Sequence, residues 1–112
     1  MKEEIKNLWV EALRSNKYKQ GKGNLRNIND EFCCLGVLCD ISLQYSLLEW
    51  ELKSLNYSIL NHSTVLPIEV MNWADIKMEL GEYEKSCLST QNDIGKSFEE
   101  IADIIEKYWE TL

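Results

Sequence analysis

The amino-acid sequence predicts a single α+β domain with three to four helices packed on a small antiparallel sheet. Helical spacing of apolar residues occurs at both ends of the chain, and short strand patterns separated by turn residues lie between them. The length of 112 residues, of which 45% are apolar, suits one hydrophobic core. We therefore assign residues 1–112 to one domain and find neither an internal repeat nor a linker.

The two end helices are predicted from local signals. The apolar residues of the first one recur at helical spacing, with charged residues between them, and it should end near Ser15. Ser97 and Glu100 form the pattern of a capping box, in which each side chain bonds to the backbone amide of the other residue at a helix start. A last helix with one broad apolar face should follow, up to Leu112.

The middle of the chain contains a central helix and several short elements. Cys34–Tyr45 is apolar enough for a buried helix, and Gly36 lets another backbone approach it closely. Asn29 and Asp30 predict the turn of a short hairpin. The other elements we expect are hairpin arms at Leu25–Ile28 and Glu31–Cys33, a loop at Leu47–Leu55, strands at Tyr57–Leu60 and Ser63–Leu66 joined by Asn61–His62, a helix over Ile68–Ile76 started by Pro67, a short strand around Lys85–Ser89 and a turn at Asn92–Gly95.

Charge is distributed unevenly along the chain. The net charge of −7 argues against general binding to nucleic acid, which requires Lys and Arg to replace the counterions of phosphates. The stretch from Arg14 to Arg26, called the basic segment below, carries +5 with no acid, so that the remaining residues carry −12. Such segregation focuses a positive potential on one small surface. Its cations are Arg14, Lys17, Lys19, Lys22 and Arg26.

The basic segment is our candidate anion site. Gly21 and Gly23 would let backbone amides approach a phosphate, although the spacing is not that of a Walker loop. The alternative is a solvated surface loop whose cations offset the neighbouring acidic helices. The candidate ligand-binding residues are Lys17, Lys19, Lys22 and Arg26 for phosphate contact, with Tyr18 and Trp9 for stacking on a base.

The cysteines and the single histidine do not indicate a catalytic or metal site. Cys33, Cys34 and Cys39 lie close together in an apolar stretch without a CxxC motif, which favours buried free thiols in a reducing cytoplasm. A metal site completed by His62 or Cys87 is the alternative. No nucleophile motif accompanies His62, so we expect no catalytic residue, no metal and no cofactor.

Aromatic residues and hydropathy bear on partners and location. Four Trp and five Tyr exceed what a small core easily buries, so some of them should line a pocket or a partner surface. The sequence is equally compatible with the alternative that all four Trp lie in the core. No apolar run reaches the length of about 18 residues that spans a bilayer, and the charged N-terminus is unlike a signal peptide. We therefore expect a cytoplasmic protein.

Three stretches carry a family resemblance. They are Leu-Trp-Val-Glu-Ala-Leu-Arg-Ser at 8–15 with Tyr-Lys-Gln-Gly-Lys-Gly at 18–23, Phe-Cys-Cys-Leu-Gly-Val-Leu-Cys-Asp at 32–40, and Asn-Asp-Ile-Gly-Lys-Ser-Phe-Glu-Glu-Ile-Ala-Asp-Ile-Ile-Glu at 92–106. In order and spacing they resemble a widespread group of small phage and prophage proteins that are mostly called hypothetical. The resemblance implies a phage accessory protein in a bacterial cytoplasm. Proteins of that kind often counter host defence, some by sequestering the nucleotide signals of systems such as Thoeris or CBASS.

These observations lead to a ranked set of functional hypotheses. The first is a non-catalytic, homodimeric phage-type binding protein that sequesters a small anionic, nucleotide-derived host immune signal of the cyclic nucleotide or cyclic ADP-ribose type. The alternative is a protein–protein inhibitor of a host defence factor, including an acidic DNA-mimic mode. A third hypothesis, an enzyme that degrades such a signal, predicts multiple turnover.

Overall fold

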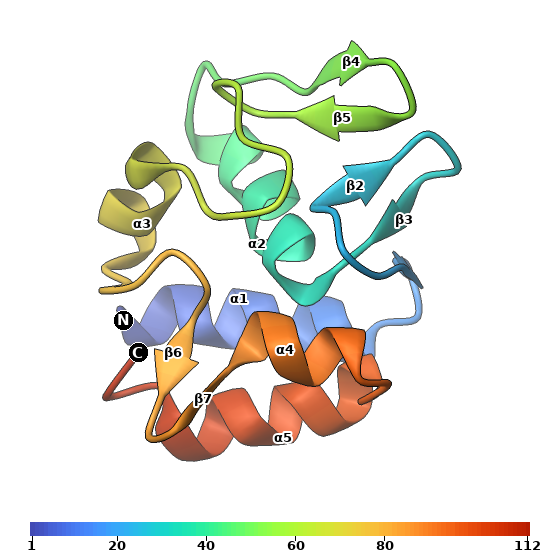
Figure 1. Cartoon of the computed structure of the whole chain (residues 1–112). Coiled ribbons are helices and arrows are strands. Elements are labelled where there is room, and N and C mark those ends of the chain that lie inside the picture. Colours follow the sequence, from blue (N-terminus) through green and yellow to red (C-terminus); the bar gives the residue numbers. More distant parts are fainter.

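The computed structural model describes residues 1–112 and confirms the α+β class (Figure 1). The helices are α1 (Glu3–Arg14), α2 (Cys34–Ser42), α3 (Ile68–Ala74), α4 (Leu88–Asp93) and α5 (Phe98–Tyr108), with a 3-10 turn, η1 (Leu43–Tyr45), directly after α2. The strands are β1 (Lys19–Gln20), β2 (Arg26–Asn27), β3 (Glu31–Phe32), β4 (Glu51–Lys53), β5 (Asn56–Ser58), β6 (Glu82–Tyr83) and β7 (Ser86–Cys87).

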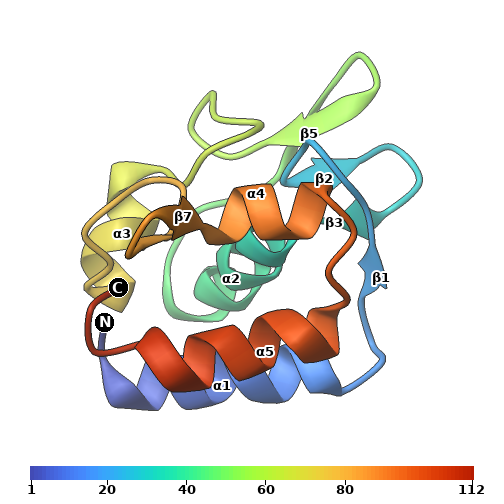
Figure 2. The same cartoon turned by 60° about the horizontal axis from the view of Figure 1, so that its bottom comes forward.

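The helices α1 and α5 run antiparallel and side by side along one face of the molecule, which brings the two termini together (Figures 1 and 2). The amino group of Met1 donates a hydrogen bond to the carbonyl oxygen of Trp109 at 3.1 Å. The predicted capping box is confirmed, since Ser97 accepts from the Glu100 amide and the Glu100 carboxylate accepts from the Ser97 amide. None of the helices has the length and apolar character that a membrane span requires.

The main sheet has the strand order β1-β3-β2-β5-β4 and is mixed rather than wholly antiparallel. The predicted hairpin is confirmed, because β2 and β3 pair antiparallel and Asp30 occupies the turn with a positive φ of 57°. The side chain of Asn27 stabilises this turn by accepting a hydrogen bond from the Asn29 amide at 2.9 Å. The edge strand β1 pairs parallel to β3 with Lys19 opposite Glu31. A strand of two residues is too short for an alternation pattern, and the sequence did not predict it.

Three other elements differ from the sequence prediction. Strand β4 lies in the segment that the sequence predicted to be a loop. The sequence did not predict it, because its three residues are all exposed and show no apolar alternation. The hairpin expected around Asn61–His62 shrinks to one bridge between Ile59 and His62, and β5 pairs with β4 and β2 instead. Helix α4 was not expected, and it forms because tertiary burial of Leu88 and Asn92 outweighs the poor helix propensity of Ser89, Thr90 and Asp93. The turn expected at Asn92–Gly95 is present at its C-terminal end, where the Gly95 amide donates to the Asn92 carbonyl oxygen at 3.3 Å.

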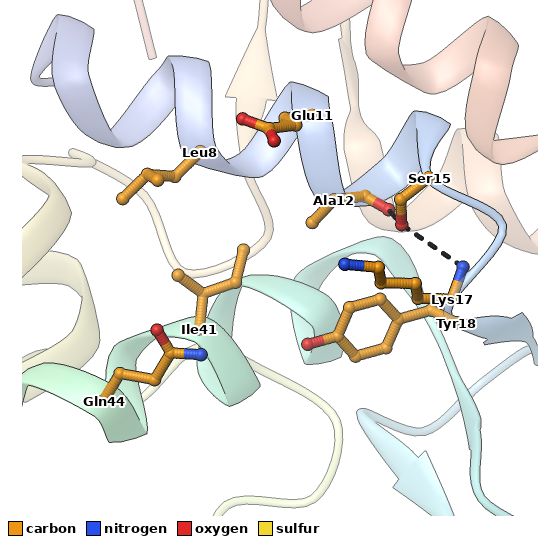
Figure 3. A pocket seen from close by; sticks show the side chains of 8 residues that line it. All are labelled: Leu8, Glu11, Ala12, Ser15, Lys17, Tyr18, Ile41 and Gln44. Atoms are coloured by element: carbon orange, nitrogen blue, oxygen red, sulfur yellow. Dashed lines mark hydrogen bonds between the residues drawn. The ribbon is translucent and has the colours of Figure 1, made fainter.

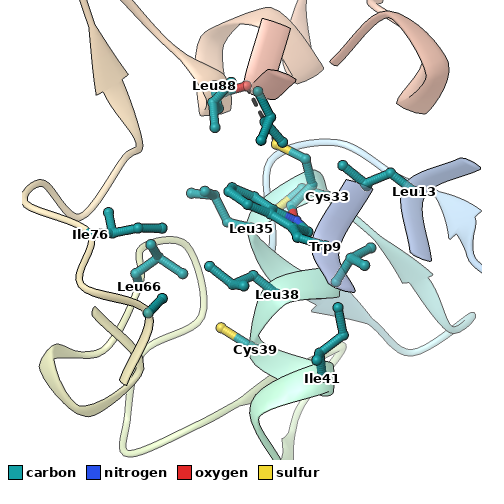
Figure 4. Close-up of a cluster of buried hydrophobic side chains, with 14 of the residues drawn as sticks. Trp9, Leu13, Cys33, Leu35, Leu38, Cys39, Ile41, Leu66, Ile76 and Leu88 are labelled. Atoms are coloured by element: carbon teal, nitrogen blue, oxygen red, sulfur yellow. Dashed lines mark hydrogen bonds between the residues drawn. The ribbon is translucent and has the colours of Figure 1, made fainter. Parts of the chain in front are cut away.

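The hydrophobic core is built around α2, of which every residue except Asp40 is buried (Figure 4). Gly36 makes this packing possible. A Cβ atom at this position would lie 1.7 Å from the backbone oxygen of Leu25, so only glycine lets the segment before β2 cross the helix. The close backbone approach expected at Gly36 is thereby confirmed.

The four cysteines are free and buried, which confirms the interpretation as core thiols. Figure 4 shows Cys33 and Cys39 among the apolar side chains around Trp9. Burial raises the pKa of Cys33 to about 11, and it raises the pKa values of Cys34 and Cys39 well above their ordinary value. These thiols therefore stay protonated and unreactive in the folded protein.

We expect the stability to fall as the pH rises from 9 to 11. Folding raises the thiol pKa values of Cys33, Cys34 and Cys39, so below about pH 9 both states keep the protons, while above it only the unfolded chain releases them. Each thiol should lower the free energy of unfolding by up to about 1.4 kcal/mol per pH unit. Urea unfolding with a phosphine reductant measures this slope, and a Cys39→Ala variant whose slope equals that of the wild type would contradict the explanation.

Candidate ligand-binding cleft

Most of the positive charge in the basic segment is neutralised within the fold. Three of its five cations form ion pairs, whereas Lys17 and Lys22 have none. The potential at this surface is therefore weaker than the charge count of +5 indicates. The pairs are Arg14 with Asp103 (2.6 Å), Glu99 (3.3 Å) and Glu106 (3.8 Å), Lys19 with Glu31 (3.5 Å), and Arg26 with Asp30 (2.6 Å).

Two of the six candidate ligand-binding residues, Lys17 and Tyr18, come together at a cleft between α1 and α2 (Figure 3). The cleft has a volume of about 210 Å³ and mixes apolar with polar side chains. In Figure 3 the ammonium group of Lys17 points into the space between the two helices. The lining residues are Leu8, Glu11, Ala12, Ser15, Lys17, Tyr18, Ile41 and Gln44.

The chain leaves α1 in a fixed geometry that places Lys17 at the cleft. The Ser15 hydroxyl donates to the Ala12 carbonyl oxygen at 2.6 Å and accepts from the Lys17 amide at 3.2 Å. Asn16, between them, takes a positive φ of 61° and so turns the chain back toward α2. The backbone at Lys17 is thus fixed at the rim of the cleft, and no ion pair occupies its ammonium group.

Tyr18 forms a rigid wall of the cleft. Its hydroxyl donates to Asp40 Oδ2 at 2.6 Å, and its ring packs edge to face on Phe32 at a centroid distance of 5.1 Å. Asp40 also accepts from Trp50 Nε1 at 2.9 Å. Burial, reinforced by the Asp40 carboxylate, raises the pKa of the Tyr18 hydroxyl well above its ordinary value, so this group stays protonated.

Trp9 is not available for stacking on a ligand, which corrects the sequence prediction. It is completely buried, and its Nε1–H donates to the carbonyl oxygen of Cys34 at 2.9 Å. The reason is its place on the apolar face of α1, between Ile5 and Leu13, which packs into the core. The side chain stabilises the contact between α1 and α2 instead.

Arg26 is also used by the fold. Its guanidinium lies 3.9 Å from the centroid of the Tyr57 ring and within 6 Å of two further rings, those of Phe32 and Trp50. With its ion pair to Asp30, it connects β2 to the β4–β5 hairpin. Lys19 is exposed and lies across the sheet edge from its partner Glu31, so neither Arg26 nor Lys19 joins Lys17 at the cleft.

The glycine amides of the basic segment already have partners. The Gly21 amide donates to the Phe32 carbonyl oxygen at 2.8 Å, and the Gly23 amide donates to the Asp93 carboxylate at 3.0 Å. The expected approach of these amides to a phosphate is therefore not available in this conformation, because a carboxylate of the protein occupies that role. Lys22, between them, is exposed and lies outside the cleft.

Asn92 anchors the basic segment to the core, which the sequence did not indicate. Its fully buried side chain accepts from the Cys34 amide at 3.2 Å and from Gln20 Nε2 at 2.9 Å. It also donates to the Gly21 carbonyl oxygen at 2.8 Å. Asn92 thereby satisfies a free amide at the start of α2 and holds β1 beside it. This structural role explains Gln20 and Gly21 without a ligand.

Sequence reasoning missed the polar residues that α1 and η1 contribute to the cleft. Glu11 and Ser15 lie on the same side of α1 as Leu8 and Ala12, and this shared face was the only available signal. Gln44 follows α2 and reaches the cleft only because the two helices pack together. Neither Lys17 nor Glu11 forms an ion pair, so the cleft presents one free cation and one free carboxylate.

Comparison with known proteins assigns the chain to a family. No curated protein and no solved structure is significantly similar to this chain. A family model described as "Domain of unknown function (DUF8296)" matches residues 1–109, which include the cleft, most of the core and both end helices. The chain therefore belongs to the DUF8296 family.

Proposed function

We propose that this protein is a non-catalytic binding protein whose cleft between α1 and α2 captures a small anionic, nucleotide-derived ligand. The observation that carries this proposal is the unpaired Lys17, held at the rim of a cleft that also contains apolar side chains. A phosphate group pairs favourably with such a cation. In line with the phage resemblance, the ligand class is a host immune signal of the cyclic nucleotide or cyclic ADP-ribose type.

The chemistry of the cleft suits the parts of a nucleotide. Lys17 would contact a phosphate, while Glu11 and Gln44 would bond to sugar hydroxyls or to the base edge. Leu8 and Ile41 offer an apolar surface to the sugar or base. The single carboxylate of Glu11 favours a ligand with hydroxyl or amino donors over a bare inorganic phosphate.

The size of the cleft sets a limit on the ligand. Its volume of about 210 Å³ is below the range of roughly 300–1,000 Å³ that is usual for small-molecule pockets. It accommodates a phosphate with its adjacent sugar, and the rest of a larger signal would extend out of it. A homodimer that brings two clefts together would enclose more of the ligand, and we retain this assembly as part of the proposal.

Replacing Lys17 with alanine should weaken binding of an anionic nucleotide about tenfold or more, because the cleft loses its only cation. Isothermal titration calorimetry with cyclic AMP, ADP-ribose and uncharged adenosine measures this effect. The matched control is Lys22→Ala, which removes the other unpaired cation of the basic segment and should leave affinity unchanged. Equal losses in both variants, or adenosine binding as tightly as ADP-ribose, would contradict the assignment of the cleft.

Sequestration and degradation give different outcomes at excess ligand. The Tyr18 hydroxyl stays protonated and donates a hydrogen bond to Asp40, so it is unsuited to act as a general base. A trace of protein mixed with excess ADP-ribose should therefore return the ligand intact. Multiple turnover would favour the degrading enzyme instead.

The alternative function, inhibition of a host protein, is supported by a different surface. The DNA-mimic mode draws little support from α5, because its carboxylates Glu99, Asp103 and Glu106 converge on Arg14 and are partly neutralised. A partner-binding mode is supported by an exposed apolar groove beside α3.

A further inference from the structure

An apolar groove lies between α3 and the segment that follows α2, away from the cleft. It has a volume of about 360 Å³ and shares no lining residue with the cleft. Aromatic and aliphatic side chains form most of it, with the Tyr45 and Trp73 rings stacked at a centroid distance of 5.6 Å. The lining residues are Ser42, Tyr45, Ser46, Leu47, Leu48, Glu69, Val70 and Trp73.

The exposed apolar residues of this groove are not needed by the core. Leu47 is completely exposed, and Tyr45 is 58% exposed, although both are large apolar side chains. Large apolar side chains that gather at one exposed groove are typical of an interaction surface. The stacked pair of Tyr45 and Trp73 is a rigid anchor surface of the type that dominates binding energy at protein interfaces.

The charges around the groove indicate what it binds. Glu69 is its only charged lining residue, and the exposed Glu49 follows directly after Leu48. No Lys or Arg lines the groove, and the whole chain carries −7. A second copy of the chain would bring more acid to this surface, whereas a basic partner is attracted to it.

The backbone around the groove selects the shape of the partner. None of the lining residues belongs to a strand, so no sheet edge is present for an extended peptide to pair with. Side chains of α3 and of the α2–β4 connection form its walls, which is the arrangement that receives a helix.

We propose that this groove is the docking site for a basic amphipathic helix of a partner protein. This proposal rests on the partner-binding function and not on the cleft. The apolar face of the helix packs on Tyr45, Leu47 and Trp73. A Lys or Arg at the edge of that face pairs with Glu69. Because the two sites share no lining residue, a variant of one leaves the other intact.

Two model peptides test this docking site. Each has about 18 residues, a length that supports a stable helix, with leucines at i, i+3, i+4 and i+7 on an alanine background. On the face opposite the leucines, one peptide carries Lys and the other carries Glu at the same positions, and alanine occupies the rest. Calorimetry should give micromolar affinity for the Lys peptide and at least about tenfold weaker binding for the Glu peptide.

Three variants separate the groove from the general acidity of the chain. Leu47→Ser should weaken the Lys peptide about tenfold without loss of thermal stability, because Leu47 is fully exposed. Glu69→Lys should reverse the preference between the peptides. Glu84→Lys, at the turn between β6 and β7, makes the same charge change outside the groove and should preserve the preference.

Specific outcomes would overturn this docking site. They are equal binding of the two peptides, equal effects of Glu69→Lys and Glu84→Lys, or unchanged affinity in Leu47→Ser. A wild-type dimer that Leu47→Ser converts to a monomer in sedimentation experiments would show that a second copy covers the groove instead. ADP-ribose binding measured in Leu47→Ser keeps this result separate from the cleft, since failure of one site leaves the other measurable.

Discussion

Replacing Gly36 with alanine is expected to lower the free energy of unfolding by more than about 4 kcal/mol or to prevent folding. The added Cβ would lie 1.7 Å from the Leu25 backbone oxygen and 2.6 Å from its carbonyl carbon. Both partners are backbone and cannot rotate away. Hydrogen bonds also hold Leu25 in place. Its amide donates to the Ser63 carbonyl oxygen, and its own carbonyl oxygen accepts from the Cys33 amide.

Gly23→Ala is the matched control for this substitution. Gly23 has a positive φ of 80° and no atom within 4 Å of the added Cβ, so alanine there adds only backbone strain. That strain costs about 1–2 kcal/mol. Urea unfolding followed by circular dichroism compares the two variants. A Gly36→Ala protein as stable as the Gly23→Ala protein would contradict the close approach of α2 to Leu25.

Replacing Asn92 with alanine is expected to cost roughly 3 kcal/mol or more of unfolding free energy. The change leaves the Cys34 amide and the Gly21 carbonyl oxygen without partners in a buried place, at about 1–3 kcal/mol each. Gln20 is affected less, because its side chain also donates to the Lys96 carbonyl oxygen at 2.8 Å. The exposed Asn72 on α3 provides the control, and its change to alanine should have little effect.

The Asn92→Asp variant tests the same hydrogen bonds, because it replaces the neutral amide with a group that can carry a negative charge. A carboxylate keeps the acceptor for the Cys34 amide but faces the Gly21 carbonyl oxygen and lies beside Asp93. Burial and repulsion raise its pKa in the folded state, so this variant should gain stability as the pH falls from 7 to 5. Denaturation at both pH values measures the difference. Stability within about 1 kcal/mol of the wild type in Asn92→Ala would refute the anchoring role.

The elements that the sequence predicts correctly are those with local signals. The capping box of Ser97 and Glu100 and the apolar periodicity of α1 and α5 lie within one or two helical turns, and Gly36 is marked by its place in an apolar helix. Asn92 has a turn-forming side chain, and its role depends on Cys34, which is 58 residues away. No local pattern reports such a contact, so α4 and its anchor were missed.

The candidate site was only partly predictable for the same reason. Counting charges identifies the basic segment, but ion pairs decide which cations remain free. Arg14 is paired with Asp103, which is 89 residues away, and Arg26 packs on Tyr57 of a strand that the sequence placed with other partners. Trp9 lies on the apolar face of α1 and is buried in the core. Its position in the helical periodicity therefore predicted its role better than its aromatic side chain did.

The most direct test of the cleft is a nitrogen–proton NMR titration with ADP-ribose. We expect the backbone amides of Ser15, Lys17 and Gln44, which line the cleft, to shift on titration. The shift of the backbone amide at position 17 should be absent when adenosine is the ligand, and it should also be absent in the Lys17→Ala variant. Shifts confined to the loop at 22–25 or to the groove residues Tyr45–Leu48, or no shifts at millimolar ligand, would contradict the assignment of the α1–α2 cleft as the binding site.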